Sequence, residues 1–259
     1  MHGIDMKPTE RFSTRVEVYR RYRPGYPEEI AGLLERECGL TQTVMIADVA
    51  AGTGLLSEIF LERGYAVDAI EPNASMRAAC ETLCERWPRL RCSDGTAEAT
   101  GLPDRSADLI TVAQAMHWFD LARTRKEFAR VLRPGGWCAV IYNHRRMGGD
   151  GFHDGYEQIL REFGGDYLAV QERHMTPEKL AAFFAPSVAK EAVFPNAQRL
   201  TLEGLEGRIV SSSYMPQAGE VRYVTMREAI ERLFEKNERD GVVTIEYECS
   251  VVYGQLSTR

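Results

Sequence analysis

The chain has 259 residues, of which 44% are hydrophobic, with a formal net charge of −6. This length allows one large globular domain, or one domain with an inserted cap. The acidic balance argues against a nucleic-acid substrate, because phosphate binding generally needs a basic surface. No apolar run approaches the roughly 20 residues of a membrane helix, and the N-terminus lacks the apolar core of a signal peptide, so we expect a cytoplasmic protein that does not bind membranes.

The six cysteines predict neither a disulfide framework nor a metal site, because none of them forms a C-x-x-C pair. Cys80 and Cys84 lie one helical turn apart, which is typical of packing residues. No metal cofactor is expected.

An aromatic and arginine-rich N-terminal segment, residues 1–40, comes first. It contains Tyr22 and Arg23 and then a turn made by Pro24, Gly25 and Pro27. Residues 28–38 follow as a predicted helix with one apolar face.

Residues 44–71 form the stretch on which the functional prediction depends. Residues 44–49 are an apolar run typical of a buried parallel strand, and small residues from Ala50 to Gly54 predict a tight turn. A helix with apolar residues at helical spacing runs to Gly64. Residues 66–70 then form a second strand that ends at Glu71. This is a strand, helix, strand unit whose first turn lets a ligand approach the backbone, and whose terminal acid can accept the hydroxyls of a ribose.

Two cofactor classes fit such a unit, a dinucleotide and S-adenosylmethionine. The dinucleotide fingerprint G-x-G-x-x-G fails at its third glycine, where this chain has Ser57. An acid just before the turn, Asp48, suits a ligand that carries an ammonium and a sulfonium better than it suits a pyrophosphate. We therefore favour S-adenosylmethionine over a nicotinamide dinucleotide.

The D-x-A-x-G-x-G pattern from Asp48 to Gly54 resembles motif I of the class I S-adenosylmethionine-dependent methyltransferases, and Glu71 resembles the acid of motif II. The resemblance implies a Rossmann-like α/β fold, with a seven-stranded, mostly parallel sheet flanked by helices and a helical cap inserted after strand five. It also implies S-adenosyl-L-homocysteine as the product. The family usually has Gly where this chain has Ala50. Because alanine disfavours positive φ, we expect an ordinary backbone conformation at Ala50.

The segment after Glu71 supplies the predicted contacts to the nucleoside. Pro72 ends the strand, and Asn73 is a good N-cap for a helix over residues 74–85. Met76, in that helix, is expected either against the adenine or in the core. A third strand covers residues 90–92. Beyond it, family members often have an acid followed by Ala at the adenine. In this chain the corresponding residues are Thr96, Ala97 and Glu98.

A fourth strand over residues 108–113 delivers Gln114 and His117 to the edge of the sheet where ligands bind in α/β folds. The sequence AQAMHWFD resembles the corresponding segment of trans-aconitate-methyltransferase-like and related small-molecule enzymes. His117 is interpreted as a base or a substrate partner, or alternatively as a residue that caps the next helix or packs on Trp118. A helix over residues 121–132, a reversal at RPGG and a fifth strand over residues 137–142 complete the resemblance, which runs from residue 44 to residue 143.

The remaining chain is less regular. Residues 144–187 predict two short helices of a cap over the substrate pocket. Residues 188–259 contain a sixth strand, two helices and a strand over residues 243–253, which alternates cleanly and is expected to pair antiparallel at the sheet edge. The predicted domains are therefore residues 1–40, 41–143, 144–187 and 188–259.

These patterns together predict a methyltransferase that acts on a small molecule, such as a carboxylate or another polar metabolite, as a monomer or homodimer. A non-catalytic cofactor-binding protein and a nicotinamide-dependent oxidoreductase remain as alternatives. The predicted cofactor-binding residues are Asp48, Ala50, Gly52, Gly54, Glu71, Pro72, Met76, Thr96, Ala97, Glu98 and Gln114. The predicted catalytic residues are His117 and Tyr22. The predicted substrate-binding residues are Arg23, His144, Arg145 and Tyr214, with Arg146, Arg208 and Ser213 as further candidates at the mouth of the site.

Overall fold

The structure, a computed structural model, describes residues 16–173 and 175–256 of the chain. The first 15 residues of the predicted N-terminal segment lie outside these ranges. The chain divides into two compact units. The core unit consists of Gly25–Asn143, Met175–Phe194 and Cys249–Arg259, and the helical unit of Met1–Pro24, His144–His174 and Pro195–Glu248.

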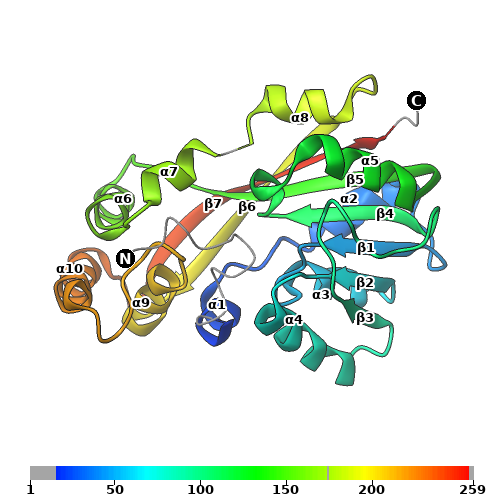
Figure 1. Cartoon of the computed structure of the whole chain (residues 1–259). Helices are drawn as coiled ribbons and strands as arrows, with labels where there is room; N and C mark the ends of the chain where they lie inside the picture. The colour runs from blue at the N-terminus through cyan, green and yellow to red at the C-terminus, as the bar shows by residue number, and fades with distance from the viewer. Residues whose placement is uncertain (1–15, 174, 257–259) are drawn as a thin grey trace. The chain divides into compact units, whose positions relative to one another are not determined.

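A single seven-stranded sheet has the strand order β3-β2-β1-β4-β5-β7-β6. Strands β1 to β5 pair in parallel, as predicted (Figure 1). The strands are β1 (Met45–Val49), β2 (Ala66–Ile70), β3 (Leu90–Ser93), β4 (Ala107–Ala113), β5 (Leu132–Arg145), β6 (Lys190–Leu200) and β7 (Val243–Gln255). The strand order reverses beside β1, which pairs with β2 on one side and β4 on the other. Ligands bind at such a switch point in open α/β sheets.

The last strand, β7, was predicted to lie at the sheet edge, and this prediction is wrong. β7 lies between β5 and β6, so that β6 is the edge strand. The predicted antiparallel direction agrees with two hydrogen bonds: the Arg146 amide donates to the Glu246 carbonyl, and the Gln255 side chain donates to the Gly135 carbonyl. The alternation of β7 is as predicted, with Val243 and every second residue through Val251 buried.

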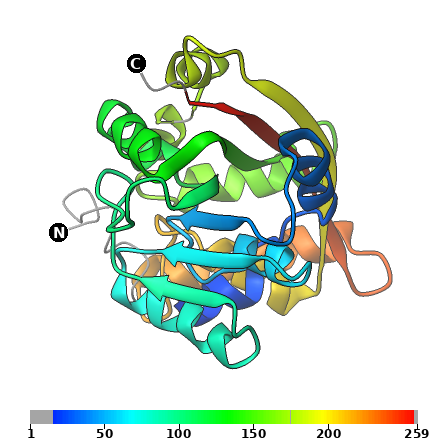
Figure 2. The same ribbon diagram turned by 90° about the vertical axis from the view of Figure 1, so that its right-hand side faces the viewer.

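Apolar residues cover both faces of the sheet in the core unit. Successive residues of β1 point to opposite sides of the sheet. Ile46 belongs to a cluster with α2 (Glu29–Cys38) and α3 (Leu55–Leu61), and Ala47 belongs to one with α5 (Leu121–Val131) and α8 (Pro177–Phe184). Figure 2 shows the strands with helices on either side. A parallel sheet is stable only when both faces are covered in this way. The helical segments of the described residues before β5 are α1 (Val16–Tyr22), α2 (Glu29–Cys38), α3 (Leu55–Leu61), α4 (Ala74–Glu81), η2 (Thr82–Glu85), η3 (Met116–Trp118) and α5 (Leu121–Val131).

The turn RPGG, predicted as a reversal between helix and strand, lies inside β5. Ala107 pairs with Leu132 and Leu109 with Trp137, so the four residues between Leu132 and Trp137 face the single residue Asp108 and form a bulge. Gly135, with φ of 82°, supplies the left-handed residue that the bulge requires.

The helical unit has its own apolar core, formed by five helices and the ends of β6 and β7. The region after strand five was predicted to hold two short helices, and the structure instead has three. The glycine pair at Gly164 and Gly165 separates α6 from α7, and a further break precedes α8. The helices after β5 are α6 (Gly151–Phe163), α7 (Tyr167–Glu172), α8 (Pro177–Phe184), α9 (Leu202–Val210) and α10 (Val221–Asn237). Of these, α8 belongs to the core unit, and the other four form the apolar core of the helical unit together with α1. Within the described ranges, no helix has the length and hydropathy needed to span a bilayer.

Candidate functional site

Asp48, near the end of β1, is buried and joins three elements. One carboxylate oxygen accepts a hydrogen bond of 2.6 Å from the Ser57 hydroxyl of α3, and the other accepts one of 2.9 Å from the Thr111 hydroxyl of β4. Burial raises the pKa of Asp48 from 3.8 to about 6, although the two hydroxyls lower it. Sequence reasoning singled out Asp48 and treated Ser57 only as a missing glycine. The structure gives Ser57 a role of its own, as a donor to this acid.

Glu71 fastens the glycine turn to the end of β2. Its two carboxylate oxygens accept hydrogen bonds from the backbone amides of Gly52, at 2.9 Å, and Asn73, at 2.8 Å. Burial raises the pKa of this side chain, and the two amides oppose that shift. Each carboxylate oxygen has a second lone pair, so Glu71 can still accept hydroxyl groups of a ligand.

The two glycines of the turn have different functions. A Cβ on Gly54 would lie 2.6 Å from Leu83 and 3.0 Å from Cys80, so Gly54 is required by packing against α4 and η2. A Cβ on Gly52 would meet no atom of the described residues within 4 Å, and φ at Gly52 is +60°. Between the two glycines, the hydroxyl of Thr53 is buried and has no hydrogen-bond partner in residues 16–173 and 175–256. An open backbone position beside an unpaired buried hydroxyl is the arrangement expected where a polar ligand lies.

The backbone at Ala50 contradicts the prediction of an ordinary conformation. Its φ is +58°, in the left-handed region that alanine disfavours, because the turn geometry that the family usually builds with Gly is kept here. Gln114, just after β4, also has a positive φ of 56°, which nothing in the sequence pattern had indicated. The backbone amide of Gln114 donates to the Ile141 carbonyl, and its side chain donates to the Asn143 carbonyl. Strained residues at the ends of two neighbouring strands are typical of functional sites.

The predicted adenine-binding residues lie in the core unit, in the segments that follow β2 and β3. Asn73 caps α4 as predicted, since its side chain accepts from the amides of Ser75 and Met76. Met76 is buried. Thr96 forms a tight turn with Ala99 through two backbone hydrogen bonds, and the residue after Thr96, Ala97, is also buried. The carboxylate of Glu98 accepts from the Asp120 amide, so it also holds the start of α5, and Pro72 links β2 to α4.

His117 lies in η3, beyond the end of β4, and is positioned by Tyr142 of β5. The imidazole Nδ1 is 3.2 Å from the Tyr142 hydroxyl, and the His117 ring centroid is 4.7 Å from that of Trp118. The Tyr142 oxygen also accepts from the His117 backbone amide at 3.2 Å and from the Met116 amide. Burial raises the pKa of Tyr142 far above its ordinary value, so the hydroxyl keeps its proton. The prediction that His117 packs on Trp118 is compatible with a role toward a ligand.

The remaining predicted residues lie in the helical unit. The ring of Tyr22 packs on α9, where a Cβ on Gly207 would overlap it, and its hydroxyl donates to Glu203 at 2.7 Å. A catalytic role for Tyr22 stays a prediction. Arg23 donates to the Ser211 carbonyl at 3.1 Å and to the Ser212 hydroxyl at 3.5 Å, and its guanidinium lies over the Tyr19 ring.

Three further predicted substrate residues differ in their surroundings. His144 is exposed at the end of β5. Arg145 forms a buried ion pair of 2.6 Å with Glu157 and lies over the Tyr156 ring, so its charge is already neutralised. The half-buried ring of Tyr214 is 5.2 Å from the ring of Tyr167. Of these three, Arg145 has the clearest structural function, and substrate binding by all three remains a prediction.

Comparisons with known proteins show the family and the fold of this chain. A family model described as a methyltransferase domain matches residues 47–140, the part of the core unit that carries the glycine turn and His117. The methyltransferase YcgJ of Bacillus subtilis, itself uncharacterized, is 30% identical over 196 residues, which cover 74% of this chain and 74% of that protein.

Two further similarities cover different lengths. An uncharacterized methyltransferase of Mycobacterium tuberculosis is 40% identical over 134 residues, or 52% of each protein, so this chain matches about half the length of that relative. A solved structure from Anaeromyxobacter dehalogenans, described as a type II methyltransferase, superposes with a TM-score of 0.61 at 23% identity and covers 92% of this chain and 100% of its own. This structural likeness establishes the fold alone.

The left-handed conformation of Ala50 predicts an unusual response to glycine. We expect Ala50→Gly to be neutral or to raise the free energy of unfolding by up to about 1 kcal/mol, because it removes the steric cost of alanine at positive φ. The control is Ala78→Gly in α4, an exposed helical position where glycine should cost about 1 kcal/mol. Urea unfolding measures both. Equal destabilisation by the two substitutions would contradict the left-handed assignment.

Burial of Asp48 predicts a stability that depends on pH. Between pH 3.8 and about 6 the folded protein retains a proton that the unfolded chain has lost. The stabilisation by this proton is complete below pH 3.8 and is lost as pH rises through 6. The free energy of unfolding of Asp48→Asn should therefore exceed that of the wild type by about 1 to 3 kcal/mol at pH 7.5, and the two should differ little near pH 4.

The control for this titration is Asp94→Asn, at an exposed residue that forms only a surface ion pair with Arg77. Its effect on the free energy of unfolding should be small at both pH values. An Asp48→Asn effect that does not change with pH would show that the buried carboxyl does not titrate in this range.

Proposed function

This chain belongs to the methyltransferase family and has the class I fold, and from that premise we propose that it transfers a methyl group from S-adenosyl-L-methionine to a small-molecule acceptor. The observation that carries the proposal is the turn after β1. There, two buried acids lie at the switch point of the sheet, beside a glycine with open space on its Cβ side and a buried hydroxyl that no described residue pairs with.

The residues present fit this cofactor. Glu71 would accept the ribose hydroxyls, Gly52 would allow the ligand to approach the backbone, and Thr53 would gain a partner for its hydroxyl. The negative charge of Asp48 lies just before the turn and favours a cationic ligand. Met76, Ala97 and the loop around Thr96 would bound the adenine.

The alternatives account for fewer of these contacts. A nicotinamide-dependent enzyme would bring a pyrophosphate to the turn, next to two acids. Ser57, at the third glycine position of that fingerprint, is committed to Asp48. Ala50 and Thr96, which depart from the family pattern, are the features that favour a non-catalytic protein. Ala50 adopts the backbone conformation that glycine would adopt, so the turn is intact.

The cofactor supplies a methyl group activated by its sulfonium, and the protein has to align the acceptor and exclude water. A carboxylate acceptor needs no base at neutral pH. The surroundings of His117 match this requirement. The Tyr142 oxygen accepts from two backbone amides and lies 3.2 Å from His117 Nδ1, so a proton donated by Tyr142 to Nδ1 would leave Nε2 as the hydrogen-bond donor of His117. We therefore assign His117 as a hydrogen-bond donor to the acceptor and not as a base.

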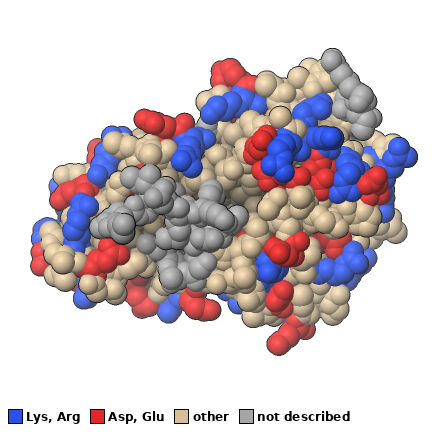
Figure 3. Space-filling model, in the orientation of Figure 1, with Lys and Arg blue, Asp and Glu red and all other residues tan. Residues whose placement is uncertain are grey.

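The surface charge pattern favours a small acceptor over a nucleic acid. On the face drawn in Figure 3, the Lys and Arg side chains of the described residues are interspersed with Asp and Glu. A polyanion would bind better to a continuous basic surface. The net charge of −6 points in the same direction.

The cofactor site can be tested with two glycines that have the same backbone strain. Gly52 and Gly39 have φ of +60° and +66°, and at neither would a Cβ meet an atom within 4 Å. Alanine should cost about 1 kcal/mol of stability at both positions. Only Gly52→Ala should weaken the binding of S-adenosylhomocysteine, by about tenfold or more, because its methyl group would fill the ligand's space. Isothermal titration calorimetry measures the affinity. Equal affinities of the two variants would exclude the turn as the cofactor site.

The role of His117 predicts which substitution restores activity. With S-adenosylmethionine and the dialysable fraction of a cell extract, we expect the wild type to release S-adenosylhomocysteine, and His117→Ala to lower this rate about tenfold or more. His117→Gln should recover part of the rate, since its amide can still donate a hydrogen bond. Both variants should bind the cofactor normally. No recovery by Gln would indicate proton removal by His117, and methylation only in the macromolecular fraction would refute a small-molecule acceptor.

A further inference from the structure

Two arginines of the helical unit, Arg23 and Arg208, are joined through Ser211. The Ser211 carbonyl accepts from the Arg23 guanidinium at 3.1 Å, and the Ser211 hydroxyl donates to the backbone carbonyl of Arg208 at 2.6 Å. Arg208 is buried in α9, and Arg23 is half-buried just after α1. Burial lowers the pKa of Arg23, and the positive charge of Arg208 lowers it further. In residues 16–173 and 175–256, no carboxylate lies within ion-pair distance of either guanidinium. A pair of like charges with this degree of burial is costly to the fold.

Other arginines of the same unit are paired. Arg145, whose side chain is only 11% exposed, lies 2.6 Å from Glu157, and Arg21 lies 3.1 Å from Glu203. The protein therefore neutralises a buried arginine elsewhere in this unit but leaves Arg23 and Arg208 with neutral partners. The Nε of Arg23 is shielded from solvent and has no hydrogen-bond partner in the described structure. An unpaired donor in a cationic cluster is the feature expected where an anion supplies the missing acceptor.

Hydroxyl groups complete the surroundings of the two guanidiniums. Arg208 donates from Nε to the Tyr247 hydroxyl at 3.2 Å, and that hydroxyl donates to Gln198 at 2.9 Å. Arg23 donates to the Ser212 hydroxyl at 3.5 Å, and the electrostatic neighbours of both arginines include Tyr156 and Tyr214. Guanidinium and hydroxyl donors in one place match an oxyanion, and guanidinium groups can bind carboxylate and phosphate through two parallel hydrogen bonds.

We propose that Arg23 and Arg208 together form the binding site for the anionic group of the methyl acceptor, so that the acceptor is a small oxyanion, either a carboxylate or a phosphate ester. This inference rests on the proposed function for its identification of the ligand as the acceptor. The anion site itself stands on the helical unit alone.

The test uses malonate and inorganic phosphate as probes, with neutral malonamide and an equal ionic strength of sodium chloride as references. We expect at least one oxyanion to raise the unfolding temperature of the wild-type protein, and neither reference to do so. Arg23→Gln and Arg208→Gln should each weaken oxyanion binding by about ten- to hundredfold in calorimetric titration. A preference for malonate identifies a carboxylate acceptor, and a preference for phosphate identifies a phosphate ester.

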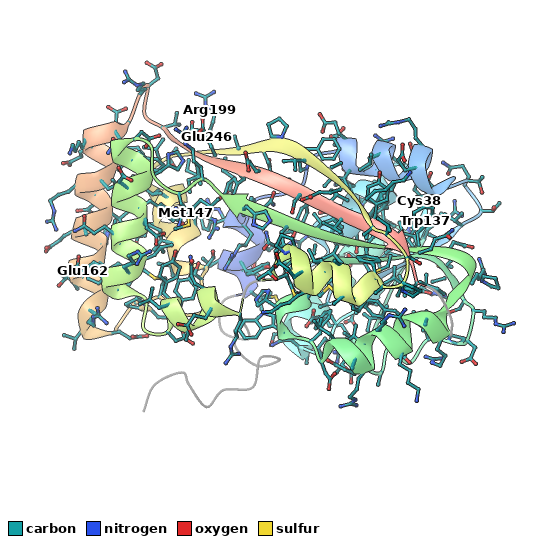
Figure 4. All side chains as sticks on the ribbon, turned by 90° about the horizontal axis from the view of Figure 1, so that it is seen from above. Cys38, Trp137, Met147, Glu162, Arg199 and Glu246 are labelled. Atoms are coloured by element: carbon teal, nitrogen blue, oxygen red, sulfur yellow. The ribbon has the colours of Figure 1, made fainter. Side chains whose placement is uncertain are left out.

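The control is Arg199→Gln, at an exposed arginine of β6 that belongs to the same unit and is labelled in Figure 4. Its oxyanion affinity should equal that of the wild type. Oxyanion effects that match sodium chloride, or that persist in both Arg23→Gln and Arg208→Gln, would overturn the site. If Arg208→Gln does not fold, the wild-type comparison and Arg23→Gln still decide the question, because Arg23 is only half-buried.

Titration with S-adenosylhomocysteine separates this inference from the proposed function. The variants should retain the wild-type affinity for S-adenosylhomocysteine. Loss of that affinity in Arg23→Gln with normal oxyanion binding would assign Arg23 to the cofactor and overturn the anion site. Oxyanion binding by a wild-type protein that does not bind S-adenosylhomocysteine would refute the proposed function and leave the anion site in place.

Discussion

The site depends on the hydrogen bonds that the buried carboxylate of Asp48 accepts. Its two hydrogen bonds join β1 to α3 through Ser57 and to β4 through Thr111, which fixes the strand ends on either side of the switch point. The cost of burying this acid appears in its raised pKa of about 6. A cationic ligand near the turn would stabilise the ionised Asp48 carboxylate and so lower that cost. The buried negative charge that destabilises the site without a ligand is therefore the same charge that would attract a cation.

Glu71 completes this framework from the neighbouring strand. By accepting the Gly52 amide it holds the turn in a conformation that places positive φ at Ala50, Gly52 and Gly54. The left-handed alanine shows that the turn geometry is imposed by these contacts and not by the intrinsic preference of each residue. The steric cost of positive φ at Ala50 is offset by the packing of the surrounding sheet, which is buried on both faces.

The two units contribute different chemistry. The core unit supplies two buried acids, an open glycine and an imidazole whose Nδ1 lies 3.2 Å from the Tyr142 hydroxyl, and the acids suit the cationic cofactor that we propose. The helical unit supplies guanidinium and hydroxyl groups. The Arg145–Glu157 pair is structural, whereas Arg23 and Arg208 carry positive charge that the described protein leaves unneutralised. The anion site that we propose rests on this difference between Arg145, which has a carboxylate partner, and the other two arginines, and not on the number of arginines in the unit.

The sequence by itself determined the order and type of the elements from residue 44 to residue 143, apart from RPGG, which lies inside β5, because period-two and helical patterns, the Asn73 cap and the glycine turn are local features. It also determined the two acids and the family. Only the tertiary structure decided that β7 lies between β5 and β6, since strand order depends on which edges meet and not on alternation within a strand. It likewise decided the backbone of Ala50, the partners of His117 and the meeting of Arg23 with Arg208, which are 185 positions apart in the chain. These depend on contacts between distant segments, and no local pattern encodes them.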